Sequence, residues 1–393
     1  MKRQIFDELE NLYDEMIDIR RWLHMYPELS FQEVNTAKFI ADFQRDLGLD
    51  VKTNVGGNGV VATLRGGKPG KNVAIRADFD ALPIIEENDV PYKSKYEGVM
   101  HACGHDAHTA IALGMSKAFS SIKEELEGNI IFIHQHAEEQ DPGGAASMVE
   151  AGALEGVDVI FATHMENYIP VGHIWHNDQY VLGSSDDFVI EIKGAGGHAA
   201  FPQDSADVIA IGSQLISNLQ QIISRKVDPL KPAVLTVGSF HAGEKGNVIP
   251  NSARLEATVR TFDEDVRTQI HDLVNQITEN TCKSYGADYH LDYQFGYPAT
   301  KNDKSTNQLM VNAAKDVLPE ENIIEMEPNM GAEDFSYFLQ KTPGTYFFTG
   351  SANEEKGLVY PYHHPKFDID EMALLNGAKV LSSSVIDYWK KHN

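Results

Sequence analysis

Three mostly apolar runs, each followed directly by ionisable residues, constrain the fold of this chain most strongly. They are Val73–Ala77, Asn129–His134 and Val157–Thr163. Segments with helical periodicity separate them, which is typical of the buried strands of an open, mostly parallel sheet. Functional residues in such sheets gather beyond the carboxyl ends of the strands. The sequence therefore predicts an α/β domain with helices on both faces of a mostly parallel sheet and a polar site at one edge.

The pattern changes after about residue 183. Phe188–Ile192 alternates apolar and polar residues, as in a strand with one wet face. Two helical patterns and further alternating strands follow in the order βαββαβ, which favours a smaller α+β module with helices on one face of its sheet. The α/β pattern then returns, so the module is predicted to be an insertion. We expect a first domain of residues 1–183 and 300–393, interrupted by a second domain of residues 184–299.

Charge and cysteine content exclude several classes of partner. The net charge of –25 comes from 33 basic and 58 acidic residues, and such a surface repels nucleic acids and anionic membranes. Cys103 and Cys282 are the two cysteines, too few for a disulfide framework, which favours a reducing, cytoplasmic setting. We find no apolar run of the kind that marks a signal peptide or a membrane span.

The segment Met100–Thr109 carries most of the candidate chemistry. It places one thiol, three imidazoles and a carboxylate just ahead of a helical pattern. In an extended loop, the side chains of Cys103 and His105 point the same way, so both can reach one metal ion. A thiolate with an imidazole suits zinc, and imidazole suits most first-row metals. The helix N-terminus is also expected to lower the pKa of the Cys103 thiol, so a redox role stays open at this point.

Three further stretches offer metal-binding side chains in predicted loops. Glu138 and Glu139 follow an apolar strand, His164 ends another, and His363 and His364 lie before the last helix. Adjacent glutamates usually project in different directions, so one can bind a metal while the other acts as general base. Taken singly, the glutamates are more typical of a solvated loop and His164 of a core histidine. Their common position after apolar strands favours a shared site.

Together these residues resemble the aminoacylase/carboxypeptidase-G metallopeptidases. The resemblance is strongest to the branch of auxin–amino-acid-conjugate hydrolases, hippurate hydrolases and N-acetyldiaminopimelate deacetylases, and it extends nearly from end to end. Seven motifs carry it, in this order: Arg76–Pro83 (RADFDALP), His101–Asp106 (HACGHD), Ala137–Glu139 (AEE), Gly194–His198 (GAGGH), Asn247–Pro250 (NVIP), Gly331–Phe335 (GAEDF) and His363–Pro365 (HHP).

This resemblance implies a catalytic domain with two divalent cations and a lid domain that also forms a homodimer. Glu138 is expected to be the general base, and His198 of the lid to reach into the partner subunit's site and stabilise the oxyanion. The choice of His363 over His364 as a ligand rests on the alignment of the motif alone. The implied metal ligands are Cys103, His105, Glu139, His164 and His363.

Four more residues are weaker candidates. Asn247 and Arg260 are candidates for holding a carboxylate or carbonyl of the substrate, although Arg260 at a strand end is equally typical of a surface residue. Asp80 and Asp106 are expected to orient ligating imidazoles. Both aspartates also fit an ordinary turn.

The expected activity is metal-dependent hydrolysis of the amide bond of an N-acyl amino acid, such as an acetyl or benzoyl derivative. The expected cofactors are two divalent ions per chain, manganese or zinc, with cobalt or nickel also compatible. A dipeptidase or carboxypeptidase is the alternative enzyme, and a non-catalytic metal- or ligand-binding relative is the third hypothesis. His136, where the family commonly has proline, and Met165–Tyr168 depart from the family pattern and leave the substrate preference open.

Overall fold

The computed structural model describes residues 1–392, which divide into two compact units. Unit 1 comprises Met1–Val181, Lys301–Glu327 and residues 334–392, and unit 2 comprises Leu182–Thr300 and Pro328–Glu333. The divisions lie one or two residues from those expected from the sequence. The short segment Pro328–Glu333 was not expected in the second unit. It belongs there because the N–H of Gly183 donates to the carbonyl of Asn329 at 3.0 Å.

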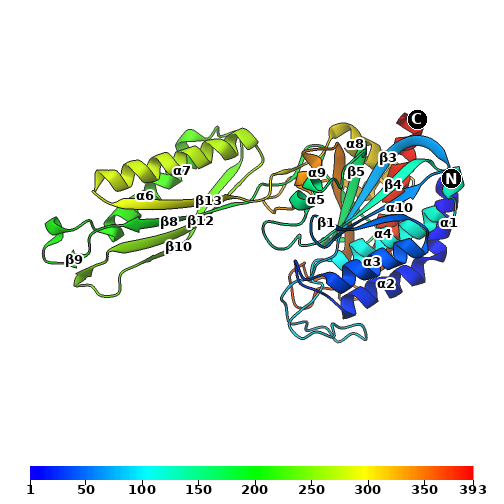
Figure 1. Ribbon diagram of the computed structural model, residues 1–393, viewed down its shortest axis with the longest axis horizontal. Coiled ribbons are helices and arrows are strands. Elements are labelled where there is room, and N and C mark those ends of the chain that lie inside the picture. The colour runs from blue at the N-terminus through cyan, green and yellow to red at the C-terminus, as the bar shows by residue number, and fades with distance from the viewer. Residues whose placement is uncertain (393) are drawn as a thin grey trace. The chain divides into compact units, whose positions relative to one another are not determined.

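Unit 1 is built on an eight-stranded sheet with the order β1-β2-β4-β3-β5-β16-β6-β15. Its central strands β4, β3, β5 and β16 are parallel. Antiparallel pairing joins β1 to β2, β2 to β4 and β6 to β16, and the edge strand β15 is again parallel to β6. The predicted mostly parallel α/β sheet is therefore confirmed (Figure 1). The strands of the sheet are β1 (Asp50–Val55), β2 (Gly59–Arg65), β3 (Lys68–Asp78), β4 (Glu127–Gln135), β5 (Val159–Pro170), β6 (Ile174–His176), β15 (Ile323–Glu325) and β16 (Gly344–Ala352).

The helices of unit 1 lie on both faces of this sheet. Helices α4 and α10 pack against the central strands and against each other, and α1 and α2 pack on that pair. Helices α5 and α9 lie together on the other side of the sheet (Figure 1). The bounds are α1 (Lys2–Asn11), α2 (Tyr13–Met25), α3 (Val34–Asp46), α4 (His105–Ser120), α5 (Ala145–Glu150), α8 (Lys304–Ala314), α9 (Ser336–Leu339) and α10 (Met372–His392).

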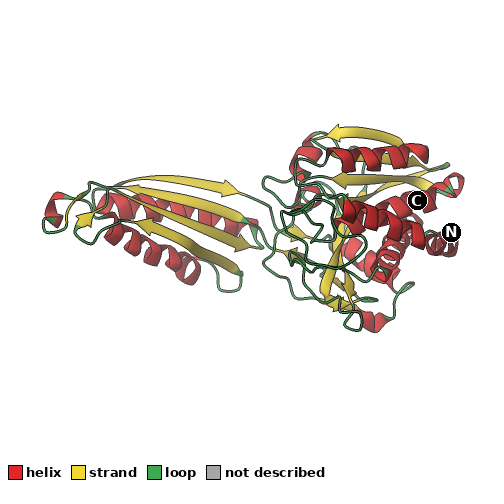
Figure 2. Cartoon of the chain, turned by 90° about the horizontal axis from the view of Figure 1, so that it is seen from below, coloured by secondary structure: helices red, strands yellow, loops and turns green. Residues whose placement is uncertain are grey.

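Unit 2 contains a four-stranded antiparallel sheet with the order β10-β12-β8-β13. Its two helices cover one face, with Ile211 and Leu215 of α6 and Val274 of α7 buried in the core of the unit (Figure 2). The predicted βαββαβ order is present, with two short strands added. The bounds are β8 (Asp186–Lys193), β9 (Gly197–His198), α6 (Val208–Gln221), β10 (Ala233–Ala242), β11 (Val248–Ile249), β12 (Ser252–Thr261), α7 (Glu264–Ser284) and β13 (Asp288–Phe295).

The remaining elements are short. They are the strands β7 (Tyr180–Leu182) and β14 (Thr300–Lys301), the 3₁₀ helices η1 (Lys123–Glu125), η2 (Pro202–Asp204) and η4 (Glu320–Asn322), and the π-helical turn η3 (Ile222–Lys226). Among residues 1–392, no helix combines the length and the apolar composition that crossing a membrane requires.

A buried ion network connects α2 to the start of α4 and to the segment before α10. The guanidinium of Arg20, which has no exposed surface, donates to Asp106 at 2.9 Å, Asp368 at 2.6 Å and Glu371 at 3.2 Å. His24 Nδ1 lies 2.8 Å from Asp106 as well. Burial lowers the pKa of His24, but its hydrogen bonds to carboxylates outweigh burial and raise that pKa to about 9. The network therefore pairs buried charges that belong to three distant segments.

We predict that Arg20→Ala strongly destabilises the protein. Removal of the guanidinium leaves buried carboxylates without their partner, which typically costs about 3–5 kcal/mol. Urea unfolding measures the loss. Arg65→Ala is the control, because the Arg65–Asp50 pair is largely exposed, at 70% and 56%, and such pairs contribute about 0–1 kcal/mol. Equal, small losses in both variants would contradict a structural role for the network.

Candidate metal centre

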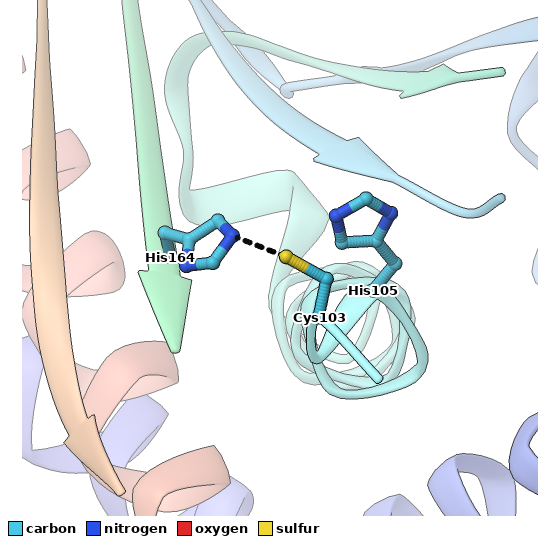
Figure 3. Close-up of side chains that lie close together, drawn as sticks. All are labelled: Cys103, His105 and His164. Atoms are coloured by element: carbon cyan, nitrogen blue, oxygen red, sulfur yellow. Dashed lines mark hydrogen bonds between the residues drawn. The ribbon is translucent and has the colours of Figure 1, made fainter. Parts of the chain in front are cut away.

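Candidate ligands from four segments of unit 1 converge at the edge of the sheet where β3 and β4 end. His164, which was expected in a loop, lies within β5, because this strand continues to Pro170. The Sγ atom of Cys103 lies 3.3 Å from Nε2 of His164 at β5 (Figure 3). Nε2 of His105, the first residue of α4, lies 3.9 Å from Oε1 of Glu139, and Nε2 of His363 lies 3.3 Å from Oε2 of Glu139. Ligand atoms lie within 4.8 Å of one another in three overlapping groups: Cys103/His105/His164, Cys103/Glu139/His363 and His105/Glu138/Glu139.

Backbone geometry brings these loops close. Gly104 has φ +86°, and a Cβ atom at this position would lie 2.8 Å from the Cβ atom of Met165. Glycine therefore allows the loop to turn into α4 directly against β5. The N–H of His363 donates to the carbonyl of Ala102 at 2.7 Å, which ties the loop before α10 to the same turn.

Two of the candidate imidazoles are oriented by hydrogen bonds on Nδ1. His105 Nδ1 lies 3.0 Å from the carbonyl oxygen of Asp80 and 3.1 Å from its Oδ1. His164 Nδ1 lies 2.7 Å from the carbonyl of Met165. Because a carbonyl oxygen can only accept, Nδ1 carries a proton in both rings. Nε2 is therefore the nitrogen of each ring that can bind a metal once it is unprotonated.

The buried Asp80 side chain contacts two candidate ligands at once. Besides His105, it accepts the backbone N–H of Glu139 at 3.0 Å and the hydroxyl of Ser30 at 2.7 Å. Asp106 behaves differently from what we expected. Its carboxylate binds Arg20 and His24, neither of which is a candidate ligand, so the expectation that Asp106 orients a ligating imidazole is wrong.

The donor set fits a divalent cation. Nε2 of His105 and Oε1 of Glu139 are buried and have no hydrogen-bond partner among the described residues, although buried polar atoms are nearly always paired. Burial lowers the pKa of His105, but the Asp78 and Asp80 carboxylates outweigh burial and raise it to about 10, so the site favours positive charge. A thiol, imidazoles and a carboxylate are together compatible with first-row divalent metals.

The environment of Cys103 corrects another expectation. Burial, followed by the charges of Glu139 and Glu138, raises the pKa of the Cys103 thiol well above its usual value. The helix N-terminus was expected to lower this pKa. It is raised instead, because burial and the nearby carboxylates both disfavour the thiolate. A cation beside the sulfur would favour the thiolate instead, as metal binding does in general.

His108 is a residue whose contacts the sequence reasoning missed. Its Nδ1 lies 2.6 Å from Asp78 Oδ1, and its Nε2 accepts the backbone N–H of Met165 at 2.9 Å. His108 therefore fixes the peptide that follows His164. The only signal in the sequence was that His108 is the third imidazole of the loop, which does not reveal this contact.

Two further histidines, His134 at the end of β4 and His364 before α10, make contacts that do not involve the candidate ligands. Nε2 of the buried His134 lies 3.0 Å from the Gln44 amide nitrogen on α3, and burial lowers the pKa of His134 to about 3. His364 stacks on Tyr360 with ring centroids 4.5 Å apart, and its Nδ1 accepts the N–H of Lys366 at 3.0 Å. The geometry thus favours His363 over His364 as the residue that faces Glu139.

Three of the candidate residues belong to unit 2. The short strand β9 ends at the exposed His198, which pairs with Val248 of β11, and the N–H of Ala199 donates to the carbonyl of Asn247 at 3.2 Å. The side chain of Arg260 on β12 donates to the carbonyl of Val259 at 3.0 Å. The parts of His198, Asn247 and Arg260 in catalysis remain predictions.

Comparisons with known proteins agree with this site. Residues 74–387 match the family model Peptidase family M20/M25/M40. YhaA of Bacillus subtilis (strain 168) is 48% identical over 388 residues, 99% of this chain and 98% of that protein. N-acetyl-L-cysteine deacetylase of the same organism is 38% identical, over 96% of this chain and 88% of that protein.

A solved structure is similar over nearly its full length. The crystal structure of the Bacillus subtilis YXEP protein, described as a dinuclear metal-binding peptidase of the M20 family, superposes with a TM-score of 0.84 and 33% identity, covering 97% of this chain and 99% of that one. The resemblance inferred from the motifs is therefore confirmed. This chain belongs to peptidase family M20/M25/M40 and is a metal-dependent amidohydrolase of that family.

Proposed function

We propose that this protein hydrolyses the amide bond of N-acyl amino acids with two bound divalent cations. The observation that carries the proposal is the convergence of five candidate ligands and a second glutamate, with overlapping groups of ligand atoms within 4.8 Å. The similarity to N-acetyl-L-cysteine deacetylase supports an N-acyl substrate. The proposed ligands are Cys103, His105, Glu139, His164 and His363.

The residue types suit this chemistry. Divalent cations held by the proposed ligands would lower the pKa of a bound water and polarise the substrate carbonyl. Glu138, which is only 8% exposed and has a carboxylate oxygen within 4.8 Å of ligand atoms of His105 and Glu139, accepts the proton of the attacking water and passes it to the leaving amine. His198 from unit 2 of a partner subunit donates to the carbonyl oxygen as negative charge develops, so the active form is a homodimer. Asn247 and Arg260 hold the substrate.

Peptide hydrolysis is the second candidate function. The description of the similar YXEP protein as a peptidase favours it, and the same groups can cleave a peptide bond. His136 and Met165–Tyr168, which depart from the family pattern, are the positions that we expect to influence this choice.

Manganese or zinc is the proposed metal, with cobalt or nickel also compatible. The cytoplasm is the proposed compartment, because Cys103 and Cys282 are both free.

Elemental analysis and hydrolysis assays test the proposal together. We expect about two metal ions per chain, and turnover that is lost on chelation and regained with manganese or zinc. N-acetyl amino acids, N-benzoyl amino acids and dipeptides form the substrate panel. Faster turnover of dipeptides than of both acylated classes would favour the peptidase. A folded protein that neither binds metal nor hydrolyses any of these substrates would exclude a hydrolase.

Variants of the two adjacent glutamates separate their roles. Glu138→Gln should lower kcat by about 10²–10⁴-fold, the usual contribution of a general base, while the metal content stays normal. Glu139→Gln should lose metal, because an amide is a poor replacement for a ligating carboxylate. Both are measured by metal analysis beside steady-state kinetics. Near-normal turnover of Glu138→Gln would rule out its role as the base.

Substitution of Asp80 should weaken metal binding. Asp80→Asn keeps the shape of the side chain, but its single oxygen cannot accept from both His105 and the Glu139 N–H. We expect a loss of about 10–100-fold in metal affinity, measured by competition with a chelator. Ser30→Ala is the matched control, since it removes the third hydrogen bond to Asp80 and leaves the other two. Equal metal affinity in Asp80→Asn and Ser30→Ala would show that metal binding does not need the hydrogen bonds from Asp80 to His105 and Glu139.

Mixed dimers test the proposed role of His198. His198→Ala and Glu138→Ala should each be inactive, yet a mixture of the two should regain activity if one subunit supplies His198 to the site of the other. Activity is measured after subunit exchange, which is followed with a fluorescent label on each variant. No recovery in demonstrated mixed dimers would argue for a site completed within one chain.

A further inference from the structure

The residue that precedes the two glutamates has an unfavourable backbone conformation. Ala137 has φ +53°, one of four positive values among the described residues that are not glycine. Left-handed backbone costs a residue with a Cβ atom roughly 1–2 kcal/mol. Such a conformation persists only where the surrounding structure enforces it, and it is found most often at functional sites. The turn at Ala137 sets the directions in which Glu138 and Glu139 leave β4.

A buried carboxylate holds this turn. Oε1 of Glu33 accepts the backbone N–H of Ala137 at 2.8 Å, and Oε2 of Glu33 accepts the side-chain amide of Asn58 at 3.0 Å. Glu33 has no exposed surface and lies at the N-cap of α3. The carbonyl of Ala137 in turn accepts the N–H of Gly144 at 3.1 Å. Both polar groups of the strained residue are thus bound.

The short segment from Ala137 to Glu139 is fixed at both ends. Glu33 accepts the N–H of Ala137, and Asp80 accepts the N–H of Glu139 at 3.0 Å. Glu138 lies between these two anchors. Its carboxylate can therefore keep its place beside the Glu139 carboxylate only while both peptides stay where they are. Small misplacements of reacting groups, of about 1 Å, can cost roughly 100-fold in rate.

We propose that Glu33 is a positioning residue for the hydrolytic reaction. By holding the Ala137 peptide in its left-handed conformation, it directs Glu138 and Glu139 into the site. This inference rests on the roles proposed above for these two glutamates. The segment Pro27–Glu33 carried no assigned role in the sequence, because the hydrogen bond from Glu33 to Ala137 joins residues 104 positions apart.

The neighbouring Glu28 provides a matched control. Its carboxylate accepts the backbone N–H groups of Asn35 at 3.2 Å and Thr36 at 2.8 Å, so it stabilises the first turn of the same helix α3. Loss of Glu28 therefore weakens α3 and leaves the Ala137 peptide bound to Glu33. Loss of Glu33 removes the contact to the site as well.

The experiment compares Glu33→Ala, Glu33→Asp and Glu33→Gln with Glu28→Ala. We expect Glu33→Ala, and Glu33→Asp with its shorter reach, to lower kcat by roughly 100-fold, with KM changed by less than about threefold. Metal affinity should fall about 10-fold, because Glu139 is a proposed ligand. Glu33→Gln keeps an acceptor of the same length for the Ala137 N–H, and the side-chain amide of Asn58 can turn its oxygen toward the new NH₂ group. Its kcat should therefore stay within about threefold of the wild type. Glu28→Ala should lower the melting temperature and leave kcat unchanged.

Amide hydrogen exchange separates this inference from the proposed function. Peptides that cover Ala137–Glu139 should exchange faster in Glu33→Asp than in wild type or Glu28→Ala, whatever the protein hydrolyses. Faster exchange in a protein that binds no metal would reject the proposed function and keep the positioning of the peptide. Wild-type exchange and wild-type kcat in Glu33→Asp would overturn the inference. A loss of kcat in Glu33→Gln as large as in Glu33→Ala would also overturn it.

Discussion

The candidate site depends on buried carboxylates that must each be compensated. Asp78, Asp80, Asp106 and Glu33 are all at most 1% exposed and lie around the loops that carry the candidate ligands. An isolated buried carboxylate is costly, so each one requires donors. The donors are the groups that the site needs in fixed positions. The His105 ring donates to Asp80, and the His108 ring donates to Asp78. The N–H of Ala137 donates to Glu33, and the N–H of Glu139 donates to Asp80.

The same compensation connects the site to the core. Asp106 lies in the first turn of α4, immediately after His105, and is neutralised by Arg20 of α2. Arg20 also binds Asp368, which lies in the segment between His363 and α10. The loops on either side of the ligand cluster are therefore held by one guanidinium. The position of the ligands follows from packing of α2, and not from the loops alone.

Local patterns in the sequence were sufficient for much of the fold. The apolar runs of β3, β4 and β5 predicted the parallel sheet, and the alternation that begins at Phe188 predicted the second module, because both depend on burial of neighbouring residues. Cys103 and His105 were identified as a pair because side chains two residues apart in an extended loop point the same way. The contacts of Asp106, His108 and Glu33 were not predictable, since each joins segments that are far apart along the chain. The raised pKa of the Cys103 thiol likewise depends on burial that only the folded chain defines.

Several of the places where local rules fail lie in the candidate site. Positive φ angles occur at Ala137 and His363, and unpaired buried polar atoms occur at His105 Nε2 and Glu139 Oε1. Each of these features opposes folding of the metal-free chain, and each is expected where function, and not stability, has selected the conformation. A cation between His105 and Glu139 would remove the penalty for the unpaired polar atoms. It would not remove the penalty for the left-handed backbone. The backbone strain at Ala137 must therefore be offset by the protein itself, which gives the buried Glu33 carboxylate its importance whether or not metal is bound.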